Sequence, residues 1–337
     1  MVGYSMPAES LLMIRRTNPT HHLRRLPARL YMSLVAAGLI VGLGGCSSLD
    51  SEEPPETTES VAPIPISPKA LELAEKAVSE GRFADAEDLL GRILLLDPAN
   101  IDARLITAEL YLAKGDSKRA MTAFSALTEF PDVSARANQG AGIAMILNGA
   151  DEQGVVRLER AVEADPTLWR AWNAFGSYHD SHGRWEDAAE AYQMALAEQP
   201  DEPMLYNNRG FSLFMQGRMD EAIVDLQRAL RLDPGMEPTQ SNLRLALAWN
   251  GRYVRAMTGV AEKDMARTLN NIGYIALMRG DLENAEAYLQ RAMELDPGYN
   301  EIASRNLAYL RNLRELDSAT AQEGTPTAAE AAVADGE

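Results

Sequence analysis

The chain has 337 residues, of which 46% are hydrophobic and 24% charged, a composition typical of a folded protein. Its formal net charge is −17, although residues 1–45 carry five arginines and only one acidic residue. The remainder is therefore strongly acidic and repels phosphate backbones, which disfavours nucleic-acid binding. One cysteine excludes an intramolecular disulfide and a thiolate metal cage, and the whole chain has only four histidines.

Residues 1–45 are predicted to be a lipoprotein signal peptide. A basic segment ending at Arg29 precedes 16 uncharged, mostly apolar residues, which are too few for a comfortable membrane span. The segment closes with Leu43-Gly44-Gly45-Cys46, which resembles the lipobox of bacterial lipoproteins. The resemblance implies cleavage before Cys46 and covalent diacylglycerol and N-acyl lipid on that residue. An ordinary signal peptide or a membrane anchor is the alternative, and translation could start at Met1, Met6 or Met13.

The residues after the cysteine predict where the chain resides. Ser47 stands where an aspartate would be expected for retention in the inner membrane, so the usual bacterial sorting rule implies the outer membrane, facing the periplasm. Residues 46–67 form a tether rich in Pro and Glu, which proline stiffens and like charges extend. Residues 317–337 contain no Lys or Arg and are predicted to be a disordered acidic tail.

Between these segments the sequence repeats every 34 residues. Glycines recur at that interval at Gly81, Gly115, Gly149, Gly183, Gly217 and Gly251, and a last one follows at Gly280. A small residue stands five positions after each glycine and, except at Arg244, seven positions before it. Asp-Pro pairs close several units. A helix-ending glycine, close-packed small residues and a terminating proline together predict helix-turn-helix units.

The period and these residues resemble the tetratricopeptide repeat. The resemblance implies an all-α fold, a right-handed superhelical solenoid of about seven repeats over residues 68–316, with a capping helix at about residues 301–316. The sixth repeat is degenerate, because only 29 residues separate Gly251 from Gly280 and Arg244 replaces a small residue. We expect a shortened second helix there, which Gly259 would weaken further. The degenerate sixth repeat could be a hinge, an interface or the result of sequence drift.

No catalytic, metal or cofactor site is predicted, and no small-molecule substrate. His179 and His182 are three residues apart beside Asp180 and Glu186, which makes a weak metal site or a cryptic enzyme site conceivable. Packing of His179 and an interaction of His182 with the end of its helix are the simpler interpretation.

In tetratricopeptide repeats the first helix of each unit lines a concave groove through repeat positions 2, 5, 9, 12 and 13. Carried over to this sequence, the predicted peptide-binding residues are Asn207, Phe211, Phe214, Met215, Ser241, Leu245, Trp249, Asn270, Tyr274, Leu277 and Met278. The third repeat adds Gln139, Ile143 and Ile146. Asparagines can hydrogen-bond a peptide backbone, and aromatic and Met side chains can hold apolar ones. The groove has no row of Lys and Arg, so an extended or helical peptide with hydrophobic anchors is the expected ligand.

Three stretches, Asn207–Leu213, Ser241–Arg252 and Leu269–Tyr274, also resemble the TadD-type lipoproteins of Tad (Flp) pilus assembly. The resemblance implies a non-enzymatic pilotin or assembly factor whose partner is the pilus secretin or another pilus-assembly protein. The alternative is an envelope adaptor that recruits peptidoglycan hydrolases or synthases, since it would need the same anchor and repeats.

Overall fold

The structure is a computed structural model that describes residues 68–296 and 300–323. The predicted signal peptide, the lipidation site at Cys46, the tether over residues 46–67 and the last part of the predicted tail, residues 324–337, lie outside the described residues.

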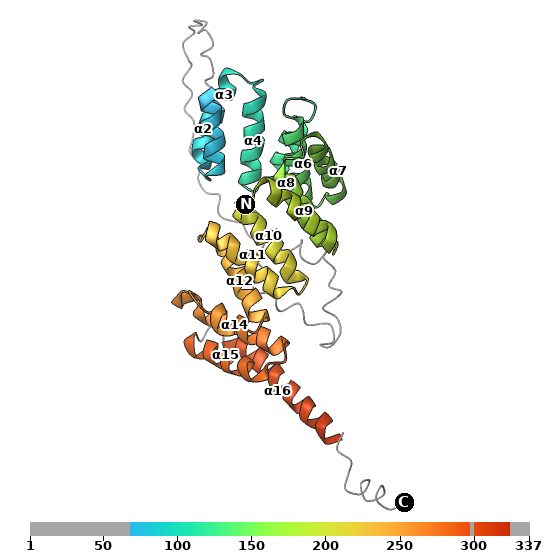
Figure 1. Cartoon of the computed structure of the whole chain (residues 1–337). Helices are drawn as coiled ribbons and strands as arrows, with labels where there is room; N and C mark the ends of the chain where they lie inside the picture. The colour runs from blue at the N-terminus through green and yellow to red at the C-terminus, as the bar shows by residue number, and fades with distance from the viewer. Residues whose placement is uncertain (1–67, 297–299, 324–337) are drawn as a thin grey trace, which may run out of the picture. The chain divides into compact units, whose positions relative to one another are not determined.

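Every element in the described residues is an α-helix, and none of them is a strand. In chain order they are α2 (Pro68–Ser79), α3 (Phe83–Leu96), α4 (Ile101–Ala113), α5 (Ser117–Ser125), α6 (Ser134–Leu147), α7 (Asp151–Ala164), α8 (Trp169–Ser181), α9 (Trp185–Glu198), α10 (Pro203–Met215), α11 (Met219–Leu232), α12 (Glu237–Trp249), α13 (Tyr253–Ala256), α14 (Glu262–Met278), α15 (Leu282–Leu295) and α16 (Asn300–Glu323). The predicted all-α fold is confirmed. The helices pair into seven helix-turn-helix units, followed by α16 as the predicted terminal helix (Figure 1).

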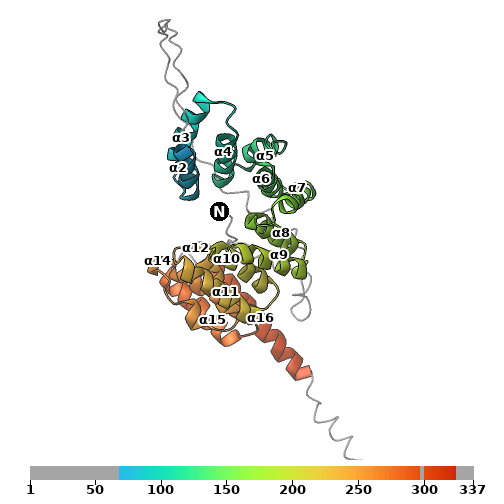
Figure 2. The same cartoon turned by 45° about the horizontal axis from the view of Figure 1, so that its top comes forward.

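The described helices belong to two compact units, divided between Leu205 and Tyr206 inside α10. The N-terminal unit contains α2 to α9, and the C-terminal unit contains most of α10 and α11 to α16. Within each unit the two helices of a repeat lie side by side, as α6 and α7 do in Figure 2. Each pair buries apolar side chains between its helices, including Phe124, Tyr192 and Leu289.

The periodic glycines end the first helix of every repeat in the left-handed conformation. Gly183 has φ +68°, and the other six have φ between +73° and +79°. At Gly183 the backbone N–H of Arg184 donates to the carbonyl of His179 at 2.9 Å, and that of Gly183 donates to Asp180 at 3.0 Å. These bonds satisfy the last carbonyls of α8. They require a left-handed backbone conformation at residue 183, which glycine adopts more readily than residues with a Cβ. The predicted role of the glycines is confirmed.

The small residues lie where the two helices of a repeat cross. A Cβ added to Gly176 of α8 would lie 2.5 Å from the ring of Tyr192 in α9, and one on Gly273 would lie 2.7 Å from Leu289. Their counterparts on the second helices, among them Ala188 and Ala285, have no exposed surface. The spacing of small residues is therefore a consequence of close helix packing.

The sixth repeat has the predicted short second helix, since α13 spans only four residues. The predicted boundary at residue 316 is wrong, because α16 continues to Glu323. Residues 317–323 contain neither Gly nor Pro and therefore allow the helix to continue, whereas Gly324 is the first helix breaker after them.

Candidate functional site

The predicted groove residues of the C-terminal unit all lie on first helices, α10, α12 and α14, but they differ in exposure. Asn207, Asn270, Tyr274 and Leu277 are buried, with Asn207 fully inaccessible and Leu277 3% exposed. The other seven are half-buried: Phe211, Phe214, Met215, Ser241, Leu245, Trp249 and Met278. The four buried residues are packing residues in this structure, because their side chains leave little or no surface for a ligand.

In three of the repeats, an amide side chain at repeat position 5 joins the first helix to the next first helix or to α16. The Oδ1 of Asn207 accepts from the Thr239 hydroxyl at 3.0 Å and from the Asn242 amide at 3.1 Å, both on α12. Gln139 Oε1 of α6 accepts from the backbone N–H of Ala171 in α8 at 3.1 Å. Buried amides need such partners. Their position in the repeat therefore serves the contact between first helices, which was not anticipated from the sequence.

The third of these amides is Asn270 of α14. Its Oδ1 lies 3.5 Å from the amide nitrogen of Asn306 in α16. We call Gln139, Asn207 and Asn270 the seam amides. They occur in the third, fifth and seventh repeats, at the same position in each.

The half-buried apolar side chains of the C-terminal unit form what we call the apolar face: Phe211, Phe214, Met215, Leu245, Trp249 and Met278. They occupy repeat positions 9, 12 and 13, which point to the same side of parallel first helices. Phe211 and Phe214 are stacked, with ring centroids 6.1 Å apart. Phe214, Leu245 and Trp249 pack against the buried core from one side. The apolar face is thus supported from below by well-packed residues.

In the third repeat position 9 holds the half-buried Ile143, but it carries a different chemistry in the first two repeats. There it holds Glu75 of α2 and Glu109 of α4, and both carboxylates pair with Arg136 of α6, at 2.7 Å and 2.8 Å. The equivalent positions in α10 and α12 hold Phe211 and Leu245. Charged side chains that neutralise one another offer less for a ligand than half-buried aromatic ones. The candidate site is therefore the apolar face.

His179 and His182 each have contacts within the chain that account for their positions. His179 stacks on Phe175 with ring centroids 6.1 Å apart, and burial lowers the pKa of its imidazole below the usual 6.5. His182 ends α8, where its Nδ1 lies 2.8 Å from the carbonyl of Tyr178. Among the described residues, no group of three or more His, Cys, Asp and Glu side chains could hold a metal ion. Packing therefore accounts for His179, and local hydrogen bonding for His182.

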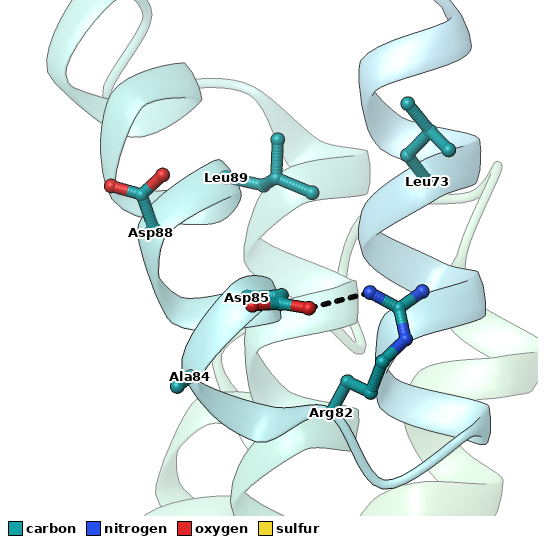
Figure 3. Close-up of a pocket in the computed structure, with 6 residues that line it drawn as sticks. All are labelled: Leu73, Arg82, Ala84, Asp85, Asp88 and Leu89. Atoms are coloured by element: carbon teal, nitrogen blue, oxygen red, sulfur yellow. Dashed lines mark hydrogen bonds and ion pairs between the residues drawn. The ribbon is translucent and has the colours of Figure 1, made fainter.

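A hollow of about 510 Å³ lies between α2 and α3 in the N-terminal unit (Figure 3). Its lining residues are Leu73, Arg82, Ala84, Asp85, Asp88 and Leu89. Arg82 pairs with Asp85 at 2.6 Å and with Glu80 at 2.8 Å. The one cationic side chain that lines this hollow is thus neutralised by neighbouring carboxylates of the same chain. We therefore do not place the functional site there.

Comparison with known proteins places the repeats in one family. Models of the tetratricopeptide repeat match residues 77–139, 157–203, 173–237 and 266–299. The chain is 23% identical over 238 residues to the BBSome complex member BBS4 of Bos taurus, and it covers 40% of that protein with 71% of its own length. The chain thus spans less than half of this relative.

Two solved structures are similar to large parts of this chain. PilF of Pseudomonas aeruginosa is 20% identical with a TM-score of 0.46, over 61% of this chain and 97% of that one. PilW, described as a type IV pilus biogenesis factor, is 18% identical with a TM-score of 0.46, over 71% of this chain and 97% of that one. Neither similarity identifies a partner for this chain. In the described part of the chain, no helix combines the length and hydropathy needed to cross a membrane.

Proposed function

Since the chain belongs to the tetratricopeptide repeat family, we propose that it is a non-enzymatic scaffold that holds a segment of a partner protein on the apolar face. The observation that carries this proposal is that the half-buried Phe214, Leu245 and Trp249 pack on the core without being covered by it, while Phe211 stacks on Phe214. Aromatic side chains in such surroundings are the residues that dominate binding energy in protein interfaces.

The chemistry of the face limits the kind of segment that it can hold. Its six members are apolar, so the segment needs hydrophobic side chains, and an acidic C-terminus would find no row of basic residues there. Asn207 and Asn270 already have hydrogen-bond donors on the neighbouring helices. Recognition of the ligand's backbone by these two amides is therefore not part of the proposal. Hydrophobic anchoring is the main source of affinity.

We further propose that the partner is the secretin of a Tad (Flp) pilus, or another protein of that assembly, and that lipid on Cys46 holds the scaffold at the outer membrane. The support is the sequence resemblance to TadD-type lipoproteins over Asn207–Leu213, Ser241–Arg252 and Leu269–Tyr274, together with the lipobox at Leu43–Cys46. Anchoring raises the effective concentration of the scaffold near partners in the same membrane.

The test is affinity capture with the full-length chain from detergent-solubilised envelope of the native host. We expect the wild type to retain the pilus secretin. The double variant Phe211→Glu, Met278→Glu should retain at least about tenfold less secretin, because each charge would be buried under the ligand. Both residues are half-buried, so the fold tolerates the change better than at a buried site such as Tyr274.

Val224→Glu is the matched control, because Val224 lies on the second helix α11 and is 61% exposed. It should capture as well as the wild type. Equal capture by the double variant would place the binding surface elsewhere on the molecule. Retention of peptidoglycan hydrolases or synthases in place of a secretin would identify an envelope adaptor and reject the pilus assignment.

A further inference from the structure

The degenerate sixth repeat leaves a hollow in the C-terminal unit. Its second helix, α13, has four residues, whereas α11 and α15 in the flanking repeats have 14 each. After Ala256 the chain turns at Gly259, which has φ +72°, and α14 begins at Glu262. Up to ten residues of a second helix are therefore missing by comparison with either neighbour.

The hollow has a volume of about 840 Å³ and lies between the end of α13, the start of α14, and α15. Its apolar lining consists of Met257, Val260, Met265, Ala266, Leu269, Ala287, Tyr288 and Leu295. Leu295 is 45% exposed, and the Tyr288 ring is held edge-on against Tyr253 with centroids 5.6 Å apart. This is an apolar surface with well-supported walls.

The neighbouring repeats show what normally occupies such a place. In α11, Leu226 and Ala229 have no exposed surface, and Leu226 packs in one cluster with Ala246 and Leu247 of the following first helix. In α15, Leu289 and Ala292 are equally buried. The two helices share the pattern Leu-Gln-Arg-Ala-x-x-Leu, at 226–232 and 289–295. The four-residue α13 has no such leucine, and its buried residues Tyr253 and Ala256 alone join the cluster that holds Ile272 and Ile275 of α14.

We propose that a short amphipathic helix of a partner protein docks in this hollow and completes the sixth repeat. The helix would present leucine and alanine three residues apart, as α11 and α15 do. The rim carries Glu262 and Lys263, of opposite sign, and Arg291, which pairs with Glu294 at 2.6 Å, so a helix with charges of both signs fits better than the acidic residues 318–337 of this chain, which contain no Lys or Arg. This site is distinct from the apolar face and does not depend on it.

The probe is a fluorescent peptide with the sequence of residues 219–232, which includes the shared pattern. Its binding to the full-length chain would be measured by fluorescence anisotropy. We expect saturable binding by the wild type and at least tenfold weaker binding by the variant Ala287→Glu, Leu295→Glu. Both substituted residues line the hollow and are exposed, so the variant should keep its helical content. A peptide with Leu226→Glu and Ala229→Glu should not bind.

Leu95→Glu is the matched control, because Leu95 is an exposed leucine near the end of α3, in the other unit. It should bind the peptide as the wild type does, and so should Phe211→Glu, Met278→Glu on the apolar face. Absent binding, or equal binding by the Ala287→Glu, Leu295→Glu variant, would overturn the proposal.

Two further outcomes would identify a different occupant and reject the partner helix. A wild-type dimer that the hollow variant converts to a monomer in analytical ultracentrifugation would show that a second copy fills the site. Peptide binding that tightens tenfold when the chain is truncated after Glu323 would show that its own C-terminal segment does.

Discussion

At the scale of single residues, glycines do two different jobs in these repeats, and the structure separates them. The periodic glycines that end first helices need the left-handed conformation, as the φ of +78° at Gly217 shows. Gly176 instead has an ordinary helical backbone and is needed because Tyr192 leaves no room for a Cβ. Both kinds follow the same 34-residue period, so the sequence alone predicts where they occur but not how tightly each one is packed.

Gly176→Ala should destabilise the protein by about 1–3 kcal/mol, since the added Cβ would overlap the Tyr192 ring. Moving that ring would also disturb the hydrogen bond of 2.8 Å from its hydroxyl to Asp180. Chemical denaturation followed by circular dichroism measures the change in the unfolding midpoint.

Gly91→Ala should change the free energy of unfolding in the opposite direction to Gly176→Ala. Gly91 lies inside α3, and a Cβ there would meet nothing within 4 Å. Alanine should raise the stability by about 0.5–1 kcal/mol, because it restricts the unfolded chain and favours the helix. If both substitutions shifted the midpoint in the same direction, close helix packing would not be the reason for Gly176.

At the scale of the helices, the seam amides connect consecutive first helices by hydrogen bonds that apolar packing alone would not provide. Asn207 is fully buried, and its oxygen serves two donors on α12. At the same repeat position, Gln139 accepts from the N–H of Ala171 near the start of α8, which also donates to the carbonyl of Leu168 at 2.9 Å. A hydrogen bond requires a particular distance and direction between donor and acceptor. The bonds of the seam amides therefore fix how far one helix is shifted along the next.

Asn207→Ala should therefore lower stability, not partner affinity. It removes the acceptor of Thr239 and Asn242, and each buried donor left without a partner costs about 1–3 kcal/mol. Ser241→Ala is the control, because the Ser241 hydroxyl only bonds back to the carbonyl of Glu237 in its own helix. Its midpoint should stay within about 0.5 kcal/mol of the wild type.

The same variants decide between the two interpretations of Asn207. If Asn207 only joins α10 to α12, the Asn207→Ala variant should capture as much partner as the wild type under conditions in which it is folded. Loss of capture with an unchanged midpoint would mean that Asn207 contacts the ligand, as its repeat position first suggested.

At the scale of the whole molecule, the sequence predicts the fold better than the site. Seven glycines and their small partners determine the number of helix pairs, and the 29-residue interval after Gly251 predicts the short α13. Repeat position shows which side of a first helix a residue occupies. It does not show how far each side chain is buried: Tyr274, Phe211 and Leu245 all occupy position 9, yet Tyr274 is buried and the other two are half-buried.

The hollow beside α13 illustrates the same limit. A deletion is visible in the sequence, and a hinge, an interface or drift would each explain it. Only the packed structure shows that Met265, Tyr288 and Leu295, which come from different parts of the repeat, gather around the missing turns. Apolar side chains brought together in this way favour an interface over drift.

The proposed lipidation of Cys46 makes a prediction about the whole chain. Palmitate analogues fed to the native host should label the wild type, and Cys46→Ala should abolish the label, because the chain has no other cysteine. The mature wild type should also lack residues 1–45 by mass spectrometry. Several acyl chains bind a bilayer far more firmly than one, so the mature protein should sediment with membranes even at high salt.

Ser47 offers the matched control, since it adjoins the same site. Ser47→Asp should keep the label and the cleavage, but should move the protein from the outer to the inner membrane fraction if the usual sorting rule applies. A Cys46→Ala chain that remains uncleaved and membrane-bound is consistent with the apolar stretch from Leu30 to Gly45 holding an unprocessed precursor. A wild type that is also unlabelled and uncleaved would show instead that this stretch is a permanent anchor, and the scaffold would then face its partners from the inner membrane.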